Sequence, residues 1–379
     1  MIKLYKFPRI AIARLVEKVS RPVSVEPETL YRQIGVRSHG RGLFDKEAVT
    51  GTSLGNKRVF WIEPDCFIVN IVFAWEQAIG RTTEADVGKI ASHRFPMYRP
   101  LPEKADLNYL VYFFNTSFGK HLLGLASPGG AGRNKTLGQS EFLELEIPVP
   151  PIEEQRRIAE ILGTWDHAIE TTEKLIAASE AQKKALMQQL LTGQKRLPGF
   201  DGDWREVRLG ELGEITYGTS PKGIAVEGGY YPIIGTGGEV GRTNQFTCKQ
   251  DSVVIGRKGS IDKPQFVRGP FWAIDTTFFV LPSEHADIVW LFHALNSMSL
   301  ARFSEASGVP SLSRTTLQSI LIKTPDIREQ SAIAQVLDCA AHETDFLRAK
   351  LETLRTEKAA LMQQLLTGKR RVNTKEMAA

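Results

Sequence analysis

The sequence contains few cysteines, and their spacing argues against two common classes of stabilised domain. Three cysteines occur in 379 residues, at Cys66, Cys248 and Cys339, and none belongs to a Cys-x-x-Cys pair or a Cys/His ligand pattern. An odd, scattered set suits neither a disulfide framework nor a structural zinc site. The sequence therefore predicts a chain without a metal site that resides in a reducing cytoplasm.

Long apolar runs are also missing. No stretch reaches the length of about 18 apolar residues that a transmembrane helix needs. The N-terminal sequence MIKLYKFPRIAIARL lacks the apolar core of a secretory signal. We therefore expect neither a membrane span nor an export signal.

Signatures of catalysis are absent as well. The sequence has no GxxxxGK[ST] phosphate loop, no HExxH motif, no FxGxG or [ND]PP[YF] methyltransferase motif and no recognisable PD-(D/E)xK nuclease core. Carboxylates are plentiful, but none has a spacing that marks a catalytic pair. These absences count against an enzyme, although a catalytic site without a known motif stays open.

The composition is that of a globular protein with a small excess of positive charge. Hydrophobic residues make up 42% and charged residues 24%, with a formal net charge of +5. The length suits two ordinary domains plus additional helices. A charge of this size favours a polyanionic partner, but an ordinary basic protein explains it equally well.

What the sequence does contain is a repeat with a period of half the chain. The residues ALMQQLLTG occur at 185–193 and again at 360–368, an offset of 175 residues. At the same offset, IEEQRRIAEIL (152–162) aligns with IREQSAIAQVL (327–337). Self-similarity over this distance indicates a duplicated architecture, in which two variable segments are each followed by a nearly identical helical segment.

Each repeated segment has the pattern of a long helix with a coiled-coil seam. Proline and acidic residues at its start and Gly193 after its last apolar residues are helix boundary signals. Seam residues recur at alternating spacings of three and four. We expect the two helices to pair antiparallel within the chain, with the variable segments at opposite ends. Gly163 predicts a kink or break, because an interior glycine costs a helix about 1 kcal/mol.

Ten residues of these helices are assigned to helix pairing or to docking of another subunit. Eight lie on the seam: Ile158, Leu162, Leu186, Leu190, Ile333, Leu337, Leu361 and Leu365. Gln155 and Gln330 lie partly off it. For these two glutamines, a solvated helix face and a contact to another subunit both stay open.

The first variable segment, residues 1–149, reads as strand-rich. We expect two buried strands within 59–75 and one helix over 107–126. Two glycine-rich stretches carry residues suited to a polyanion, because glycine permits close backbone approach and arginine binds phosphate or guanine. A solvated loop explains the first stretch better and the second equally well. The candidate DNA contacts are Arg37, His39 and Arg41 in one stretch, and Arg133, Asn134 and Lys135 in the other.

The second variable segment, residues 204–324, predicts strands within 230–246, 251–267 and 271–281, followed by a helix over 288–303. Its opening loosely echoes residues 12–22, which hints at a shared fold. The hairpin tip at 256–260 places cations between glycines, where they can reach a phosphate or enter a groove; an exposed turn with solubilising charges is the alternative. The candidate DNA contacts here are Arg257, Lys258 and Ser260, with Thr219, Ser220 and Lys222 as weaker ones.

The duplicated motifs, in this order, carry a family resemblance. IPVPPIEEQRRIAEIL…ALMQQLLTG and IKTPDIREQSAIAQVL…ALMQQLLTG, with LGELGEITYGTSP and IGRKGS, resemble the DNA-specificity subunit of type I restriction-modification systems over nearly the whole chain. The resemblance implies an α+β fold: two strand-rich target-recognition domains, separated by two long helices packed as an antiparallel coiled coil with a pseudo-two-fold repeat. The expected divisions are a first domain (1–149), a helical spacer (150–193), a linker (194–203), a second domain (204–324), a second spacer (325–368) and a disordered tail (369–379).

The resemblance also implies partners. Each domain would read one half of a bipartite site in double-stranded DNA, and the helices would set the spacing and dock two methyltransferase (modification) subunits. Restriction/translocase subunits would complete the complex. S-adenosylmethionine, ATP and Mg²⁺ would belong to those partners, and this chain would have no cofactor or active site. A coiled-coil scaffold without DNA specificity and an enzyme with a hidden site are the alternatives.

Overall fold

The computed structural model describes residues 6–129, 135–306 and 308–373. The chain divides into two compact units, and the boundary between them crosses both long helices. Unit 1 comprises Met1–Thr171 and Leu351–Ala379, and unit 2 comprises Thr172–Lys350. Each unit therefore contains one variable segment and part of both long helices.

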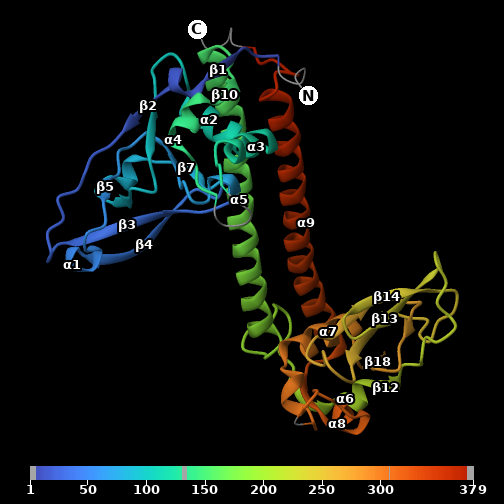
Figure 1. Cartoon of the computed structure of the whole chain (residues 1–379). Helices are drawn as coiled ribbons and strands as arrows, with labels where there is room; N and C mark the ends of the chain where they lie inside the picture. Colours follow the sequence, from blue (N-terminus) through green and yellow to red (C-terminus); the bar gives the residue numbers. More distant parts are fainter. Residues whose placement is uncertain (1–5, 130–134, 307, 374–379) are drawn as a thin grey trace. The chain divides into compact units, whose positions relative to one another are not determined.

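Unit 1 combines short strands with short helices (Figure 1). Its strands are β1 (Arg9–Ala11), β2 (Val16–Val19), β3 (Leu30–Val36), β4 (Leu43–Thr50), β5 (Val59–Trp61), β6 (Phe67–Val69), β7 (Ile79–Arg81), β8 (Ile90–Ser92), β9 (Met97–Pro100) and β10 (Glu146–Pro148). Its helices before the long repeat are α1 (Gly51–Leu54), α2 (Leu107–Phe114), α3 (Ser117–Leu125) and α4 (Gln139–Glu144).

These strands form two four-stranded sheets and a separate β1-β10 pair. One sheet has the order β2-β9-β6-β7 and is antiparallel throughout. The other has the order β4-β3-β8-β5, in which β3 pairs antiparallel with β4 and parallel with β8. The predicted strands within 59–75 are confirmed as β5 and β6, but they belong to different sheets.

The helix predicted over 107–126 is two helices. Thr116 interrupts it, because its side-chain hydroxyl accepts a hydrogen bond from the backbone N–H of Gly119 at 3.0 Å and caps α3. A Cβ at Gly119 would lie 2.4 Å from the carbonyl oxygen of Phe113, so only glycine permits this close turn. The hydrophobic faces of both helices pack into the core of unit 1.

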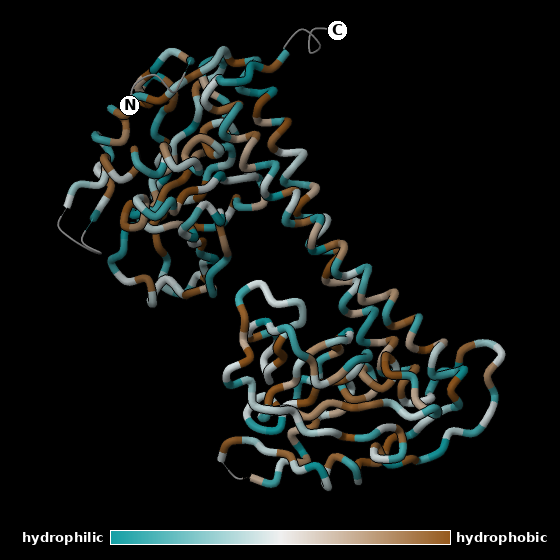
Figure 2. The backbone as a smooth tube through the Cα atoms, turned by 90° about the vertical axis from the view of Figure 1, so that its right-hand side faces the viewer, coloured by the Kyte–Doolittle hydropathy of each residue, from teal (hydrophilic) through white to brown (hydrophobic). Residues whose placement is uncertain are grey.

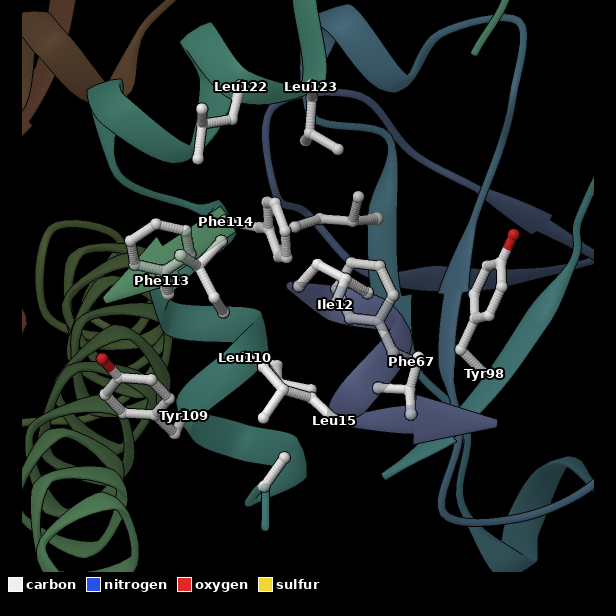
Figure 3. Close-up of a cluster of buried hydrophobic side chains, with 14 of the residues drawn as sticks. Ile12, Leu15, Phe67, Tyr98, Tyr109, Leu110, Phe113, Phe114, Leu122 and Leu123 are labelled. Atoms are coloured by element: carbon white, nitrogen blue, oxygen red, sulfur yellow. The ribbon is translucent and has the colours of Figure 1, made fainter. Parts of the chain in front are cut away.

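Figure 3 shows this core, in which apolar side chains of α2 and α3 meet those of the N-terminal segment and the sheet. Phe67 stacks on Phe142 with ring centroids 5.9 Å apart and an interplanar angle of 7°. Cys66 precedes Phe67 but belongs to a separate core cluster, and burial raises the pKa of its thiol to about 11, so the thiol is protonated. The labelled core residues are Ile12, Leu15, Phe67, Tyr98, Tyr109, Leu110, Phe113, Phe114, Leu122 and Leu123.

Unit 2 has the same kinds of element. Its strands are β11 (Arg205–Arg208), β12 (Gly213–Tyr217), β13 (Tyr231–Gly235), β14 (Gly238–Thr243), β15 (Ser252–Gly256), β16 (Gln265–Val267), β17 (Trp272–Ala273), β18 (Thr277–Pro282) and β19 (Leu321–Thr324). Its helices are α6 (Leu209–Leu212), α7 (Ile288–Ser297), α8 (Arg314–Ser319) and the long α9 (Ile327–Leu365), which crosses into unit 1.

The two units share most of their topology, as the sequence hinted, but the second sheet has four strands in unit 1, including β5, and three in the described residues of unit 2. The order β12-β18-β15-β16 repeats β2-β9-β6-β7, and β13 pairs antiparallel with β14 and parallel with β17, just as β3 does with β4 and β8. Two predictions for unit 2 are corrected. The strand expected over 271–281 is two strands in different sheets, and the helix expected over 288–303 ends at Ser297, before a 3-10 turn at Leu300–Phe303.

The long helices α5 (Ile152–Leu190) and α9 span 39 residues each and follow the 175-residue offset. In unit 1, Ile158 and Leu162 of α5 share a core with Leu365 of α9. In unit 2, Leu190 of α5 shares a core with Ile333 and other residues at the start of α9. The beginning of one helix thus packs on the end of the other in both units, so the predicted antiparallel pairing is confirmed. Hydrophobic and hydrophilic residues alternate along both helices (Figure 2).

The kink or break predicted near Gly163 is absent, because α5 is continuous from Ile152 to Leu190. Packing on either side explains the continuity. Leu162 is completely buried, and Asp166 accepts a 2.6 Å hydrogen bond from the hydroxyl of Tyr112 and pairs with Lys358. These contacts outweigh the propensity cost of one glycine.

Replacing Gly163 by alanine is expected to stabilise the protein by about 0.5–1 kcal/mol, because it removes that propensity cost. An added Cβ would meet only the hydroxyl of Tyr112, at an ordinary contact distance of 3.8 Å. Denaturant titration measures the change. Gly119→Ala is the matched control and should destabilise, because its Cβ has no space. A Gly163→Ala variant less stable than the parent contradicts this account of the helix.

Candidate nucleic-acid interface

In unit 2, two arginines share one exposed tyrosine ring. Tyr217 ends β12, and its ring packs on Phe278 with centroids 5.0 Å apart. The guanidinium carbons of Arg257 and Arg314 lie 5.5 Å and 6.0 Å from the centre of the Tyr217 ring. The cluster therefore holds two positive charges beside one aromatic surface.

The sheet explains how these residues meet. β12 and β15 both pair antiparallel with β18, so they run in the same direction and end at the same edge. Tyr217 is the last residue of β12, and Arg257 directly follows β15. Arg314 comes from the start of α8. Arg257 stands out in the sequence between two glycines, whereas Tyr217 and Arg314 do not stand out, because they lie 40 or more residues from Arg257 along the chain.

The other candidates of unit 2 lie on loops at the same edge. The predicted hairpin is confirmed by the pairing of β15 with β16, and its connection contains Lys258 and Ser260, both exposed. The N–H of Gly259 donates to the carbonyl oxygen of Pro310 at 2.9 Å, which fastens the hairpin tip to the loop before α8. Thr219, Ser220 and Lys222 are exposed in the loop that follows Tyr217. The structure therefore groups all six candidates of this unit around the end of β12 and β15.

In unit 1, the corresponding edge is formed by the loop after β6, residues 70–78. Lys135 lies there, with its Nζ 5.8 Å from the ring centre of Trp75. The equivalence of the two edges rests on a repeated hydrogen bond. Leu137 N–H donates to Ile71 O at 2.8 Å in unit 1, as Leu312 N–H donates to Arg257 O at 3.0 Å in unit 2. Arg133 and Asn134, which the sequence analysis also selected, lie outside the described residues.

The turn between β3 and β4 is attached to this same loop. His39 N–H donates to Glu76 O at 2.7 Å, and the Ser38 hydroxyl donates to the Glu76 carboxylate at 2.9 Å. His39 adopts a left-handed backbone with φ 62°. Arg37, His39 and Arg41 have exposed side chains. The turn that contains His39 and the described residue Lys135 therefore both lie beside one loop of unit 1.

A basic surface of unit 1 was missed by sequence reasoning. Two neighbouring recesses share His93 and Phe95, and among the described residues that line them none is acidic. Lys46 places its Nζ 5.5 Å from the ring centre of Phe95. We call this surface the basic cleft of unit 1; its cations are Lys18, Lys46, Lys57, Arg58 and Arg94. These cations come from separate elements of the fold. In the sequence, only the adjacent basic pairs at 57–58 and 93–94 could have indicated the cleft.

The seam candidates of both helices are internal. Ile158, Leu162, Leu190, Ile333, Leu337 and Leu365 are buried, and Leu186 and Leu361 pack partly buried against the cores. They hold the helices together within each unit. Their side chains are therefore occupied by this chain.

Gln155 and Gln330 are also internal, so the solvated helix face considered for them is wrong. Each is 1% exposed. Gln155 donates to the carbonyl oxygens of Lys104 and Pro150 and accepts from the N–H of Asp106 at 2.9 Å. Both glutamines therefore fasten the start of a long helix to the residue that caps a shorter one, since Asp106 caps α2. Gln330 makes the equivalent set of bonds, to His285 O, Pro325 O and the N–H of Asp287, the cap of α7.

A second repeated contact joins the residues after each helix to the start of the other. Arg196 forms a two-pronged ion pair with buried Glu329 at 2.6 and 2.7 Å. Arg371, at the 175-residue offset, forms the same pair with buried Glu154 at 2.7 and 2.6 Å. Residues 369–373 are thus held against the rest of unit 1, whereas the sequence predicted a disordered tail from residue 369. Residues 374–379 lie outside the described part.

The repeated architecture agrees with a known family. Residues 63–180 and 201–356 match the family described as type I restriction modification DNA specificity domain. The chain belongs to this family. Membership in this family gives the chain a role in DNA sequence specificity. It argues against both alternatives, a coiled-coil scaffold without DNA specificity and an enzyme with an unrecognised catalytic site.

Curated relatives agree with the family assignment. The chain is 26% identical over 308 residues to a putative type I restriction enzyme MjaX specificity subunit of Methanocaldococcus jannaschii, covering 73% of this chain and 71% of the relative. It is 30% identical over 109 residues to the EcoprrI specificity subunit of Escherichia coli, covering 28% of this chain and 27% of the relative. The longer match spans most of both chains.

Solved structures share the fold. The HsdS subunit from Thermoanaerobacter tengcongensis aligns over 96% of this chain and 98% of its own, with 20% identity and a TM-score of 0.55. The S subunit of a type I system from M. genitalium aligns over 96% and 97%, with 16% identity and a TM-score of 0.66. Within the described residues, no helix is both long and apolar enough to cross a membrane.

Proposed function

We propose that each unit of this chain reads one half of a bipartite sequence in double-stranded DNA. The observation that carries the proposal is that two units of similar topology present cations at equivalent loop edges but with different side chains. Units of the same fold can contact the duplex in the same way, while different residues at the contact select different bases.

The charge distribution supports this assignment. The basic cleft of unit 1 and the arginine pair of unit 2 supply the cations that phosphates attract, and aromatic side chains lie directly beside them. Loop residues such as Arg37, Arg41, Lys222 and Lys258 extend these surfaces. The net charge of +5 is modest for a lone DNA-binding protein, which suits a chain whose partner subunits share the phosphate contacts.

We assign two roles to the long helices. Their packed seam fixes the distance between the half-sites, so that two weak contacts act as one bivalent contact. Their exposed faces, rather than the buried seam residues and glutamines, dock two methyltransferase subunits. Restriction/translocase subunits complete the complex, and S-adenosylmethionine, ATP and Mg²⁺ bind to these partners.

Replacing Lys57 and Arg94 together by glutamine is expected to weaken DNA binding by the assembled complex. Log affinity falls as log salt concentration rises, and each lost phosphate contact should make this negative slope shallower by about 1. Binding is measured over a salt series with DNA carrying the recognised sequence. Lys120→Gln combined with Lys323→Gln is the charge-matched control, because both lysines are exposed and lie outside the long helices and the basic cleft; it should leave both quantities unchanged. Parental affinity and slope in the double variant would exclude the basic cleft as a DNA contact.

A further inference from the structure

We infer that Arg257 and Arg314, positioned by Tyr217, read guanine in the half-site recognised by unit 2. The inference rests on the proposed function and adds the base class, the half-site and two residues that sequence patterns did not select. Its starting point is the geometry of the cluster, in which both guanidinium groups lie within 6.0 Å of one ring centre.

The contacts within the chain leave room for a further partner. The Nη1 of Arg257 reaches the carbonyl oxygen of Asp275 only at 3.5 Å. The Nη2 of Arg314 lies 3.9 Å from the carboxylate of Glu214, whose side chain is 67% exposed. Both are long contacts, and two like charges beside one ring repel each other. A partner rich in hydrogen-bond acceptors would therefore stabilise the pair.

Guanine provides such a partner. Its O6 and N7 acceptors face the major groove at the spacing of the two prongs of a guanidinium group. Phosphate also binds arginine in this two-pronged way, but it carries no sequence information, so only a guanine contact would give a base preference. Here the ring of Tyr217 limits the directions of both arginines, and Tyr217 is itself fixed by its pairing with Phe278 in the adjacent strand. Because both arginine side chains are already ordered before binding, less side-chain entropy is lost when they contact DNA.

Unit 1 shows that the cluster is not required by the fold. Gln139 occupies the position of Arg314 at the 175-residue offset, and each begins its helix, α4 or α8. Ile71 occupies the position of Arg257, as the repeated hydrogen bonds to Leu137 and Leu312 establish. Because unit 1 lacks this arginine pair at the same place, the pair belongs to the recognition of one half-site.

The test maps methylated sites in genomic DNA from cells that express the full chain with its modification subunits. Arg257→Gln and Arg314→Gln should each reduce the preference for guanine at one position on the order of tenfold to hundredfold, in one half-site only. Tyr217→Phe retains the ring and should keep the parental preference. Tyr217→Leu should relax the preference without moving it to other positions. Arg302→Gln is the matched control, because Arg302 is an exposed arginine that lies 4.6 Å from the centre of another aromatic ring, that of Phe303; it should leave the sequence preference unchanged.

The outcomes separate the inference from the proposed function. No bipartite methylated sequence with the parent chain would overturn the proposed function, and this inference with it. A bipartite sequence that stays the same in both arginine variants would overturn the inference alone. So would an equal loss of binding to all sequences, measured on the purified complexes, because that result identifies a phosphate contact. Thermal melting of each complex establishes that the variants are folded, and Tyr217→Phe shows whether the ring acts as the positioning group.

Discussion

Replacing Gln330 by leucine is expected to lower the free energy of unfolding by about 3 kcal/mol or more. The side chain is 1% exposed and makes three hydrogen bonds between 2.9 and 3.0 Å, to His285 O, Pro325 O and the N–H of Asp287. Leucine has a similar volume, so the loss comes from the unpaired buried groups, each worth about 1–3 kcal/mol. Gln155→Leu should have a similar effect, because Gln155 makes the equivalent bonds in unit 1.

Chemical denaturation of each variant measures the effect, and Gln335→Leu provides the control. Gln335 lies on the same helix as Gln330 but is exposed, so its replacement should change stability by no more than about 0.5 kcal/mol. If Gln330→Leu were no more harmful than Gln335→Leu, the glutamine would not be the fastening that we describe.

Lengthening both long helices by one heptad is expected to change the spacing of the recognised half-sites but not their bases. Ser179 and Thr344 face each other, with their side-chain oxygens 2.8 Å apart, and mark one level of both helices. Seven residues inserted at this level in both helices complete about two helical turns, so the seam residues of each helix still face the other helix. The insertion adds about 10 Å, and the gap between half-sites should widen accordingly.

The same insertion in α5 alone should be far more harmful. In unit 1, the Asp166–Lys358 and Glu154–Arg371 pairs join the first part of α5 to the last part of α9 and the residues after it. Unit 2 joins the other ends, through contacts such as Arg196–Glu329. One helix longer than the other cannot satisfy both sets of contacts. We expect a marked loss of thermal stability with the single insertion and near-parental melting with the paired one. Equal melting of the two variants would contradict this packing.

The repeat made much of the fold predictable from sequence. A 175-residue offset that carries the seam into register, from Ile158 to Ile333 and from Leu162 to Leu337, indicates two equivalent helices. Two polar positions of this seam, Ser179 and Thr344, form a buried pair in unit 2. Periodicity depends only on residues that are close together in the chain, so it can be read directly from the sequence.

Features that depend on distant partners were not predictable in this way. Gln155 looked like a surface residue because its partners Lys104 and Asp106 lie about fifty positions earlier in the chain. Gly163 suggested a break because local propensity does not include the packing around Leu162. Thr116 divides a continuous apolar pattern into two helices through a single side-chain cap.

The candidate interface was predictable only in part. Glycine-flanked cations such as Arg257 and Lys135 stood out because their loops have a local signature. Arg314 has none, and it acquires its place beside Tyr217 only when β12, β15 and α8 come together. The basic cleft likewise combines Lys46 of β4 with Arg94, which follows β8.

The most direct test of this account is the sequence context of methylated bases in cells that express the parent chain with its modification subunits. We expect two defined half-sites separated by a fixed number of unspecified base pairs. With the paired-heptad variant, we expect methylation at the same two half-sites across a wider gap. One uninterrupted recognition sequence, or new half-site bases in the paired-heptad variant, would contradict the assignment of base choice to the two units and of spacing to the helices.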